Sequence, residues 1–504
     1  MQGKILRKKI KKTIMSELKK KSLKWRKLPK KEKKIIVNDV INEIIAMNES
    51  LEASDYSIAE LTGIENQIVN RNIIPLNKMD KVVNGLKSNK MLNLIYHKRK
   101  SYIKNKELTF IDGLLDDNVL DALMAYQGFT PSMREIMPHQ LLRAELLKCI
   151  KYPEISYRKF CSNEYFGMHQ KENKAFVRLP INKNVFIDHT QLSKFRKSLG
   201  FHNLVNIMVY IIYHLQKKGL LHDKVIHGID STDLTTTEQS LLASITINGH
   251  KVRIYTDLDA DCGKRRNKND KSTYVIGYRM HTLTAINPEN GHNLPLISLL
   301  APANHHDSLF AHPLISLAQA IGLDVKLVTA DEAYHDNQGD IYNDTGATII
   351  TPPNKTVTIP DFVDVEQKQV FCNKNCEFAM DYIGTTENNH HEFKCSANRG
   401  ECLFAGSCTG YRFIPFDSGY FQRVHNFLEQ TEHAIDIRKH SERPFNLLKN
   451  REGLKETRAK SQHGILARCV FAQMATLLIE MAGTRKKQKP KKKQEKQLSL
   501  PMAA

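Results

Sequence analysis

Two aspartates follow apolar segments that the residue pattern predicts to be buried strands. VIHGID ends at Asp230 and VKLVTAD ends at Asp331, and both segments have the composition typical of strands. Carboxylates at the carboxyl ends of buried strands lie at the crevice edge of an α/β sheet, where ligands bind. One such aspartate is weak evidence, because Asp commonly caps a turn, but two indicate a candidate catalytic site.

A third acidic residue, Glu442, has cationic neighbours at helical spacing. In IRKHSERPFNLLK, Arg438, Glu442 and Lys449 lie at positions i, i+4 and i+11, within an arc of about 40° on a continuous helix. Pro444 conflicts with continuity, because a proline inside a helix removes a hydrogen bond and clashes with the preceding turn. Either the helix kinks there or a new helix begins near Glu442. Taken alone, the segment could also be a surface Arg–Glu pair worth roughly 0.2–0.5 kcal/mol.

Other polar residues compete for the same roles. Asp233 would replace Asp230 as the functional acid if the first strand ended later along the chain. Asp307 follows two histidines in HHDS and could suggest a zinc hydrolase, but adjacent histidines point apart on a strand and no helical HExxH pair accompanies them. We expect Asp307 to lie in a loop that lines the cleft. His281 could approach the site from its strand, although a satisfied sheet histidine is the simpler interpretation.

The segments around these acids predict an α/β layer. Apolar patterns predict five strands, with a helix before the last of them. The strands are expected at residues 225–230, 244–249, 274–286, 294–303 and 325–331, and the helix at residues 309–323. Strands followed by a helix and a further buried strand are typical of α/β folds.

Upstream of this layer the pattern is helical. Apolar spacing and capping residues predict helices at residues 139–150, 155–166 and 188–200. The last of these carries Lys194 and Arg196, which could meet phosphates or form a solvated cationic face. Residues 57–73 place a small residue, a glycine and an apolar residue as a helix-turn-helix does, although corners that serve only packing have the same pattern.

The net charge of +21 comes from the two ends of the chain. Residues 1–36 hold 16 lysines and arginines against two glutamates, residues 484–504 hold eight against one, and the stretch between them is formally neutral. Two cationic arms on a neutral body fit nucleic acid, because each phosphate that is neutralised releases a counterion. Solvated tails and an anionic membrane surface are the alternatives, and nothing amphipathic near the arms favours lipid.

No segment predicts export or membrane insertion. The longest apolar run, residues 204–213, is too short to span a bilayer, which needs ~20 apolar residues. No apolar segment with a cleavage site follows the basic N-terminus. We therefore expect a cytoplasmic protein.

Five of the nine cysteines fall between Cys372 and Cys408. In a chain without an export signal, this clustering favours metal over disulfides. Cys376, Cys395, Cys402 and Cys408 could form a tetrahedral zinc site, with Cys372 as a substitute. Zinc would stabilise a segment with too little apolar content for its own core. Reduced, unligated cysteines are the alternative.

The order of several short motifs resembles that of insertion-sequence DDE transposases of bacterial type. GIDST is similar to the first-aspartate motif of that family, YVIGYRMHTLTAI to the strand that follows, LLAPANHHDS to the end of the next strand and TADEAYHD to the second-aspartate motif. RKHSERPFNLLK is similar to the family's Tyr-(2)-Arg-(3)-Glu-(6)-Lys signature, with Ile435 in the Tyr position. The resemblance covers about residues 138–483, including the helical segment at 188–200 and the cysteine-bearing insert.

The resemblance implies a reaction and a set of site residues. Asp230, Asp331 and Glu442 would be the catalytic ligands of two Mg²⁺ ions, for which Mn²⁺ can substitute, and the metals would stabilise the attacking and leaving oxygens of a phosphodiester displacement. Arg438 and Lys449 would hold phosphate near the cleavage site. The partners would be double-stranded DNA, as terminal inverted repeats and target, and a second copy of the chain in the DNA complex, at a nucleoid-associated cytoplasmic location.

The expected fold is an RNase H-like α/β domain, a mixed sheet flanked by helices, preceded by mostly helical regions. The expected divisions are a basic helical region at 1–105, a helical transposase N-terminal domain at 106–220, a catalytic domain at 221–483 with a cysteine-rich insert at about 365–412, and a basic disordered tail at 484–504. Two other function classes stay open: a catalytically silent sequence-specific DNA-binding protein, and a metal-dependent nuclease without strand transfer.

Overall fold

A computed structural model gives the architecture of the chain. The residues that it describes are 2–46, 73–86, 99–125, 136–222, 225–247, 250–266, 272–287, 291–336, 339–352, 361–364, 369–372, 376, 378–386, 390–396, 409–415, 436–450, 454 and 461–483. All but the last residue of the expected helix-turn-helix at residues 57–73, and the basic tail at residues 484–504, lie outside these described residues.

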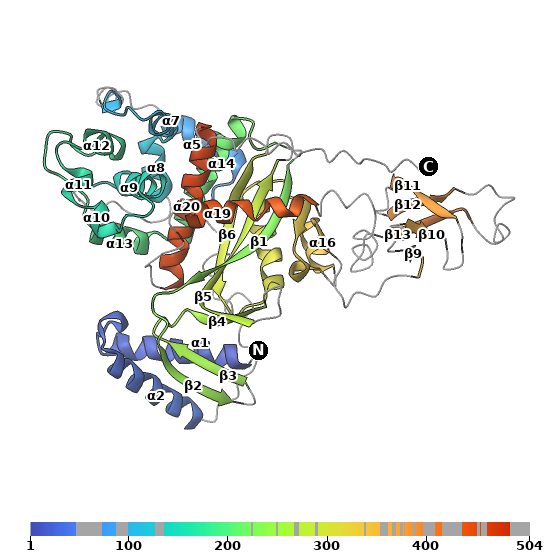
Figure 1. The fold of residues 1–504 in the computed structure, drawn as a ribbon, viewed down its shortest axis with the longest axis horizontal. Helices are drawn as coiled ribbons and strands as arrows, with labels where there is room; N and C mark the ends of the chain where they lie inside the picture. Colours follow the sequence, from blue (N-terminus) through green and yellow to red (C-terminus); the bar gives the residue numbers. More distant parts are fainter. Residues whose placement is uncertain are drawn as a thin grey trace, which may run out of the picture.

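A mixed sheet forms the centre of the molecule (Figure 1). Its strands are β1 (Ile226–Thr235), β4 (Asp261–Arg266), β5 (Ser272–Ile286), β6 (Asn293–Pro302), β7 (Leu327–Ala330) and β8 (Thr348–Ile350). β5 is antiparallel to β1 and β6, whereas β7 runs parallel to β1 and β8, which gives the order β6-β5-β1-β7-β8. β4 pairs with the first part of β5. This arrangement confirms the predicted RNase H-like fold.

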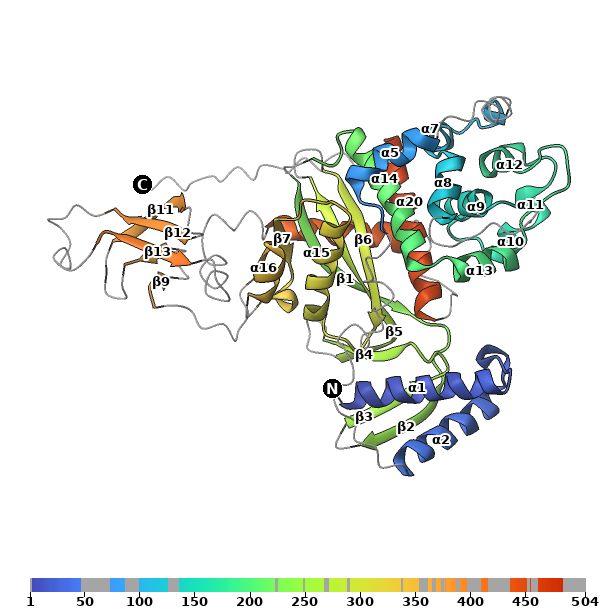
Figure 2. The same cartoon turned by 180° about the vertical axis from the view of Figure 1, so that it is seen from behind.

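Helices cover both faces of this sheet. α15 (Ala311–Ala320) packs on one face of β5 and β6, and α19 (Arg443–Asn450) and α20 (Gln462–Ala482) pack on the other, as the two opposite views show (Figures 1 and 2). Shorter helical elements connect the strands and precede α19: η3 (Asp307–Phe310), η4 (Glu332–Tyr334), α16 (Asp340–Thr345) and η5 (Arg438–His440).

Two of the predicted strands differ from the structure at their ends. The prediction that the first strand ends at Asp230 is wrong, because β1 continues to Thr235 and stays paired with β5 along its whole length. The strand expected at residues 244–249 is divided between two strands of a separate ribbon, β2 (Leu241–Ile247) and β3 (His250–Tyr255). A period-two pattern gives no information about which partner a strand pairs with.

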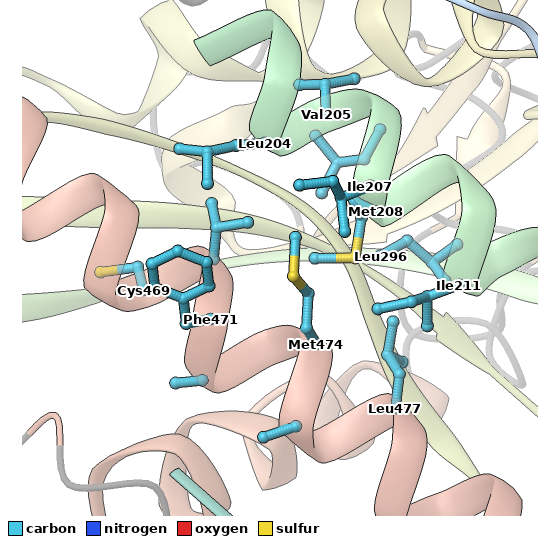
Figure 3. Packing of buried hydrophobic residues seen from close by; sticks show 14 of the residues in the cluster. Leu204, Val205, Ile207, Met208, Ile211, Leu296, Cys469, Phe471, Met474 and Leu477 are labelled. Atoms are coloured by element: carbon cyan, nitrogen blue, oxygen red, sulfur yellow. The ribbon is translucent and has the colours of Figure 1, made fainter. Parts of the chain in front are cut away.

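α20 lies at the centre of the main hydrophobic core. Figure 3 shows Met474 and Leu477 of this helix beside Met208 and Ile211 of α14 (Phe201–Lys217), with Leu296 of β6 between the two helices. Among the described helices, only α20 is long and apolar enough to cross a membrane, and most of its apolar stretch is buried inside the protein. Its apolar character therefore serves the core.

The remaining helices form a unit around a buried ionic network. They are α5 (Leu76–Leu86), α7 (Lys106–Leu114), α8 (Asp117–Ala125), α9 (Pro138–Lys151), α10 (Tyr157–Phe160), α11 (Asn163–Phe166), α12 (Lys171–Val177) and α13 (His189–Ser198). The fully buried guanidinium of Arg143 donates to Asp117 over 2.5 Å and to Asp112 over 2.9 Å, and Arg178 contacts the same two carboxylates. Such a network fixes how helices pack, because losing one partner leaves a buried charge uncompensated.

The helical unit and the sheet share one continuous core rather than two. α5 belongs to this core through Leu76, Met79 and Val83, although it precedes residue 106. The packing therefore does not follow the expected division between residues 1–105 and 106–220.

The basic N-terminal segment folds as a helical hairpin on the β2–β3 ribbon (Figure 1). The hairpin consists of α1 (Gln2–Lys20), η1 (Trp25–Lys27) and α2 (Lys30–Ala46). Every fourth residue of α1 is apolar and buried, from Leu6 to Leu18, and these side chains pack with Val252 and Ile254 of the ribbon. The sequence predicted a basic helical region here but not its docking on the ribbon, because the many lysines obscure this apolar stripe.

The cysteine-rich insert forms a separate antiparallel sheet (Figure 2). Its strands are β9 (Val363–Asp364), β10 (Gln369–Phe371), β11 (Ala379–Thr385), β12 (His390–Cys395) and β13 (Tyr411–Pro415). The expectation that this segment has too little apolar content for a core is wrong, since Val370, Phe393 and Ile414 are buried at the centre of a small cluster.

We predict that the docking of α1 depends on its apolar stripe. Ile14 is fully buried, so Ile14→Ala is expected to cost about 2–5 kcal/mol of the stability of this packing. The adjacent Met15 is 49% exposed, and Met15→Ala is the matched control. Trypsin should cut the lysine-rich hairpin at least tenfold faster in Ile14→Ala than in the control. Equal cleavage rates in the two variants would contradict the docked arrangement.

Candidate active site

Strand register places Asp230 and Asp331 side by side. The parallel pairing of β1 with β7 aligns Gly228 with Thr329 and Ile229 with Ala330. Asp230 follows Ile229 on β1, and Asp331 follows Ala330 at the point where β7 ends. Residues aligned on neighbouring strands point to the same face, so both carboxylates leave the sheet on one side. The predicted pair of aspartates therefore comes from adjacent strands.

The segment that carries Glu442 meets the same face of β1 at a glycine. A Cβ atom on Gly228 would lie 3.0 Å from the Cβ of Ser441 and 3.7 Å from the Thr329 methyl group. Gly228 and Asp230 are two residues apart and share a face of the strand. Glu442, which directly follows Ser441, is thus brought to the face that carries both aspartates. Sequence analysis did not single out Gly228, although the glycine two residues before the aspartate in GIDST was a usable signal.

The chain breaks its helix beside Glu442 rather than bending it. η5 ends at His440, and α19 begins at Arg443 with Pro444 in its first turn. Proline is tolerated there because the first helical N–H groups have no partner within the helix. Of the two alternatives for this segment, the structure adopts a new helix that begins next to Glu442. Arg438, Glu442 and Lys449 therefore do not share one continuous helix.

Asp230 has the electrostatics of a shared acidic site. Burial raises the pKa of Asp230 to about 6, with the charges of Glu442 and Asp331 also raising it. The backbone N–H of Ser231, which donates to the carboxylate over 2.7 Å, and the charge of Arg438 act in the opposite direction. The charges of Glu442, Asp331 and Arg438 thus all act on the Asp230 carboxylate.

Lys449 lies further along the same helix, near the end of β1. Burial lowers the pKa of Lys449, the charge of Arg265 lowers it too, and Asp233 acts against them. The helix therefore brings an ammonium into range of the strand that carries Asp230. An anion between Lys449 and Arg265 would stabilise both positive charges, which repel each other in its absence. Ile435, at the position that is Tyr in the resembling family, lies outside the described residues.

The two competing acids, Asp233 on β1 and Asp307 in HHDS, are held by an ionic network. Arg279 donates to Asp233 over 3.0 Å and to Asp307 over 2.7 Å, and Arg265 also contacts Asp233. Ser231 donates to Asp307 over 3.2 Å. Asp233 lies three positions after Asp230 on the strand, an odd offset, so the two side chains point to opposite faces. This network favours Asp230 over Asp233 as the member of the acidic site.

A buried aromatic group supports the second-aspartate motif. The Tyr334 hydroxyl lies 2.8 Å from Nδ1 of His281, whose ring stacks on Phe310 at 3.9 Å between centroids. His281 is fully buried, and burial holds its pKa well below the usual range. His281 is therefore a buried sheet histidine, but its Nε2 has no hydrogen-bond partner among the described residues, so it is not fully satisfied as the simpler interpretation expected.

The two cations predicted on α13 differ in their exposure to solvent. Lys194 is exposed. Arg196 instead forms an ion pair with the fully buried carboxylate of Glu145, and its guanidinium lies 4.3 Å from the centroid of Tyr157. The Arg468 guanidinium of α20 covers the same ring at 4.5 Å. Arg196 thus links the helical unit to α20, and neither predicted role, phosphate contact or solvated cation, matches its position.

Two of the four predicted zinc ligands are described by the structure. Cys376 is buried and Cys395 half-buried, whereas Cys402 and Cys408 lie outside the described residues. Across the described ranges, no three His, Cys, Asp or Glu side chains stand close enough to hold one metal ion. This applies both to the insert and to the three acidic residues on the central sheet. The zinc site therefore stays a prediction.

Comparison with known proteins gives a family match for the catalytic region. The family described as transposase DDE domain matches residues 221–478, slightly more than half of the chain. The match spans the central sheet, the insert and most of α20. No curated protein matches the chain.

We predict a pH dependence of stability that belongs to Asp230. Its pKa of about 6 in the folded protein lies above the ordinary value of 3.8, so the folded state holds the proton more tightly. The resulting stabilisation is complete below about pH 4 and is lost as the pH rises through about 6. In chelator, Asp230→Asn should remove up to about 3 kcal/mol of this dependence in urea unfolding, whereas Asp39→Asn, at an exposed position, should leave it intact. Curves of the same shape for both variants would contradict the assignment.

Proposed function

Because the chain belongs to the transposase DDE domain family, we propose that it cleaves the ends of a DNA element and joins them to target DNA by metal-dependent phosphoryl transfer. What supports this proposal is that the pairing of β1 with β7 and the approach of Ser441 to Gly228 bring the segments that carry Asp230, Asp331 and Glu442 to the same part of β1. These three side chains occupy the positions that the family motifs assign to catalytic carboxylates.

The donor set fits hard divalent cations. All three side chains are carboxylates, the ligands that Mg²⁺ and Mn²⁺ prefer. The raised pKa of Asp230 reflects a half-buried carboxylate beside two others, and positive charge would relieve that penalty. We propose that Asp230, Asp331 and Glu442 hold two such ions. Bound there, the ions would stabilise charge on the attacking and leaving oxygens and activate first water and then a 3′-hydroxyl.

The cations beside the acidic site would position the DNA. Arg438 lies within electrostatic range of Asp230 and can hold a phosphate with two parallel hydrogen bonds. Lys449 and Arg265 repel each other at the end of β1, so a phosphate between them would stabilise both charges. Together they would align the backbone along β1 so that the scissile phosphate lies over the carboxylates.

The proposed reaction also sets the wider context. Both ends of an element must be held together before joining, so we propose that two copies of the chain act in the DNA complex. DNA as the substrate would place the protein at the nucleoid in the cytoplasm.

We predict that single substitutions of the three acids abolish cleavage and leave DNA binding intact. Asp230→Asn, Asp331→Asn and Glu442→Gln should each lower Mg²⁺-dependent cleavage of an element-end duplex by at least about 10²–10³-fold. Chelator should abolish cleavage, and Mn²⁺ should restore it. Glu332→Gln, next to Asp331 and also exposed, is the matched control with near wild-type rates. Full activity in Asp230→Asn would show that the acids are not catalytic.

A precleaved substrate distinguishes the proposed reaction from its rivals. Duplex ends with a free 3′-hydroxyl, mixed with a second duplex and Mg²⁺, should give covalently joined products. A nuclease without strand transfer would cut an intact end and leave the precleaved ends unjoined. A silent DNA-binding protein would bind both substrates and change neither.

We predict that the close approach at Gly228 is needed for activity. A methyl group there would stand 2.8 Å from Ile286 Cδ1 and 3.0 Å from Ser441 Cβ, so Gly228→Ala must shift the Glu442 segment by tenths of an ångström. We expect a cleavage rate reduced about tenfold for Gly228→Ala and 10²-fold for Gly228→Val, since small misplacements of catalytic groups are costly. Gly113→Ala, where no atom lies within 4 Å, should keep wild-type activity. Wild-type rates in Gly228→Val would contradict this role.

A further inference from the structure

We infer that the tip of the N-terminal hairpin, where α1, η1 and α2 meet, is a second DNA-binding surface that grips the phosphate backbone away from the catalytic carboxylates. The inference rests on the proposed function only in taking DNA as the partner. We use the name hairpin tip for six exposed lysines: Lys19, Lys24, Lys27, Lys30, Lys31 and Lys34.

The hairpin separates its cations into an inward and an outward set. Arg7 and Lys11 point to the acidic loop after β3: Lys11 pairs with Asp259, and Arg7 donates to loop carbonyls and pairs with Asp261 at the start of β4. Burial by itself would raise the pKa of Asp259, but the adjacent Lys11 ammonium brings this pKa below its usual value. These inward charges are therefore neutralised within the protein and hold α1 in place.

The outward set consists of the six lysines of the hairpin tip. Glu17 contacts Lys20 and Lys21, and within the described part of the chain none of the six tip lysines forms an ion pair. Positive charge thus gathers at one end of the hairpin. A polyanion supplies the missing negative charge, and neutralising its phosphates releases condensed counterions.

Two of the tip lysines occupy positions that cost stability in the free protein. Lys30 and Lys31 open α2, where the helix dipole already places positive charge, and Glu32 is the only acidic residue of that turn. Cations at a helix N-terminus are unfavourable by about 0.3–1 kcal/mol each. Lys33 turns inward instead and lies over the ring of Trp25 at 5.6 Å. An arrangement that opposes folding and favours an anion indicates a binding surface more than a solvated helix end.

The hairpin tip has a fixed relation to the catalytic sheet. The loop that pairs with Arg7 and Lys11 also accepts backbone hydrogen bonds from the start of α20, from Ser461 to Asp257 and from Gln462 to Asp259, each over 3.3 Å. α20 in turn packs on β6. DNA held at the tip would therefore be held at a constant distance from Asp230, which a flexible arm could not provide.

Salt dependence of binding tests this surface without any chemistry. The full chain in chelator is titrated with a 40-base-pair duplex between 50 and 200 mM salt, and binding is followed by fluorescence anisotropy. The variant carries Lys24→Gln, Lys27→Gln, Lys30→Gln and Lys31→Gln. Each lost phosphate contact lowers the slope of log affinity against log salt by about 0.9. We expect the slope to fall by about two to four and the affinity at 50 mM salt to fall at least tenfold.

Matched variants keep the result interpretable. Gln at four exposed lysines of the helical unit, Lys104, Lys106, Lys171 and Lys183, should leave the affinity within about twofold. Arg at the four tip positions should preserve both slope and affinity, which separates loss of charge from loss of fold. An unchanged slope in the tip variant, or an equal fall in the helical-unit control, would overturn the inference.

Two further outcomes separate this surface from other interpretations. If the tip variant loses binding to phosphatidylserine vesicles while its DNA affinity is unchanged, the surface is a lipid contact and the inference fails. If no cleavage is ever seen but the tip variant still loses salt-dependent DNA binding, the proposed function fails and the hairpin tip stands.

Discussion

Asp230 is a half-buried carboxylate that feels the charges of two exposed ones, Asp331 and Glu442, and backbone contacts bring the three segments that carry these acids to the same part of β1. The pairing of β1 with β7 aligns Asp230 with Asp331. The absence of a side chain at Gly228 lets the Glu442 segment approach to Cβ contact with β1. The residual cost is visible in the raised pKa of Asp230. A divalent cation is the group that would lower it.

The rest of the catalytic region keeps these contacts in place. α20 follows the Glu442 segment and is buried in the common core of sheet and helical unit. α20 packs against α19 and β6. It therefore anchors the chain that follows the Glu442 segment. The Arg196–Tyr157–Arg468 stack connects the helical unit to the same helix. The helical unit thus stabilises the catalytic geometry as well as any surface for DNA.

Buried and exposed cations have different roles in this molecule. Buried cations such as Arg143 are matched by carboxylates within hydrogen-bond distance, because an unmatched buried charge costs several kcal/mol. Arg279 plays the same role between Asp233 and Asp307. Of the net charge of +21, by contrast, +14 lies in residues 1–36, largely on exposed lysines of the N-terminal hairpin. Solvent screens the charge of these lysines in the free protein.

The sequence by itself determined the main strands of the central sheet and the helix beside them, and it predicted which acids act. Strand patterns, the second-aspartate motif and the break that Pro444 imposes on a helix are local features, which residue order and spacing encode. The sequence left open whether the helix kinks or restarts there. The tertiary structure alone decided that β1 runs past Asp230, that Arg196 is paired inside the protein, and that the basic N-terminal segment docks on a ribbon more than 200 residues away. These outcomes depend on which surfaces meet, and burial and partner charges are properties of the folded chain rather than of any segment.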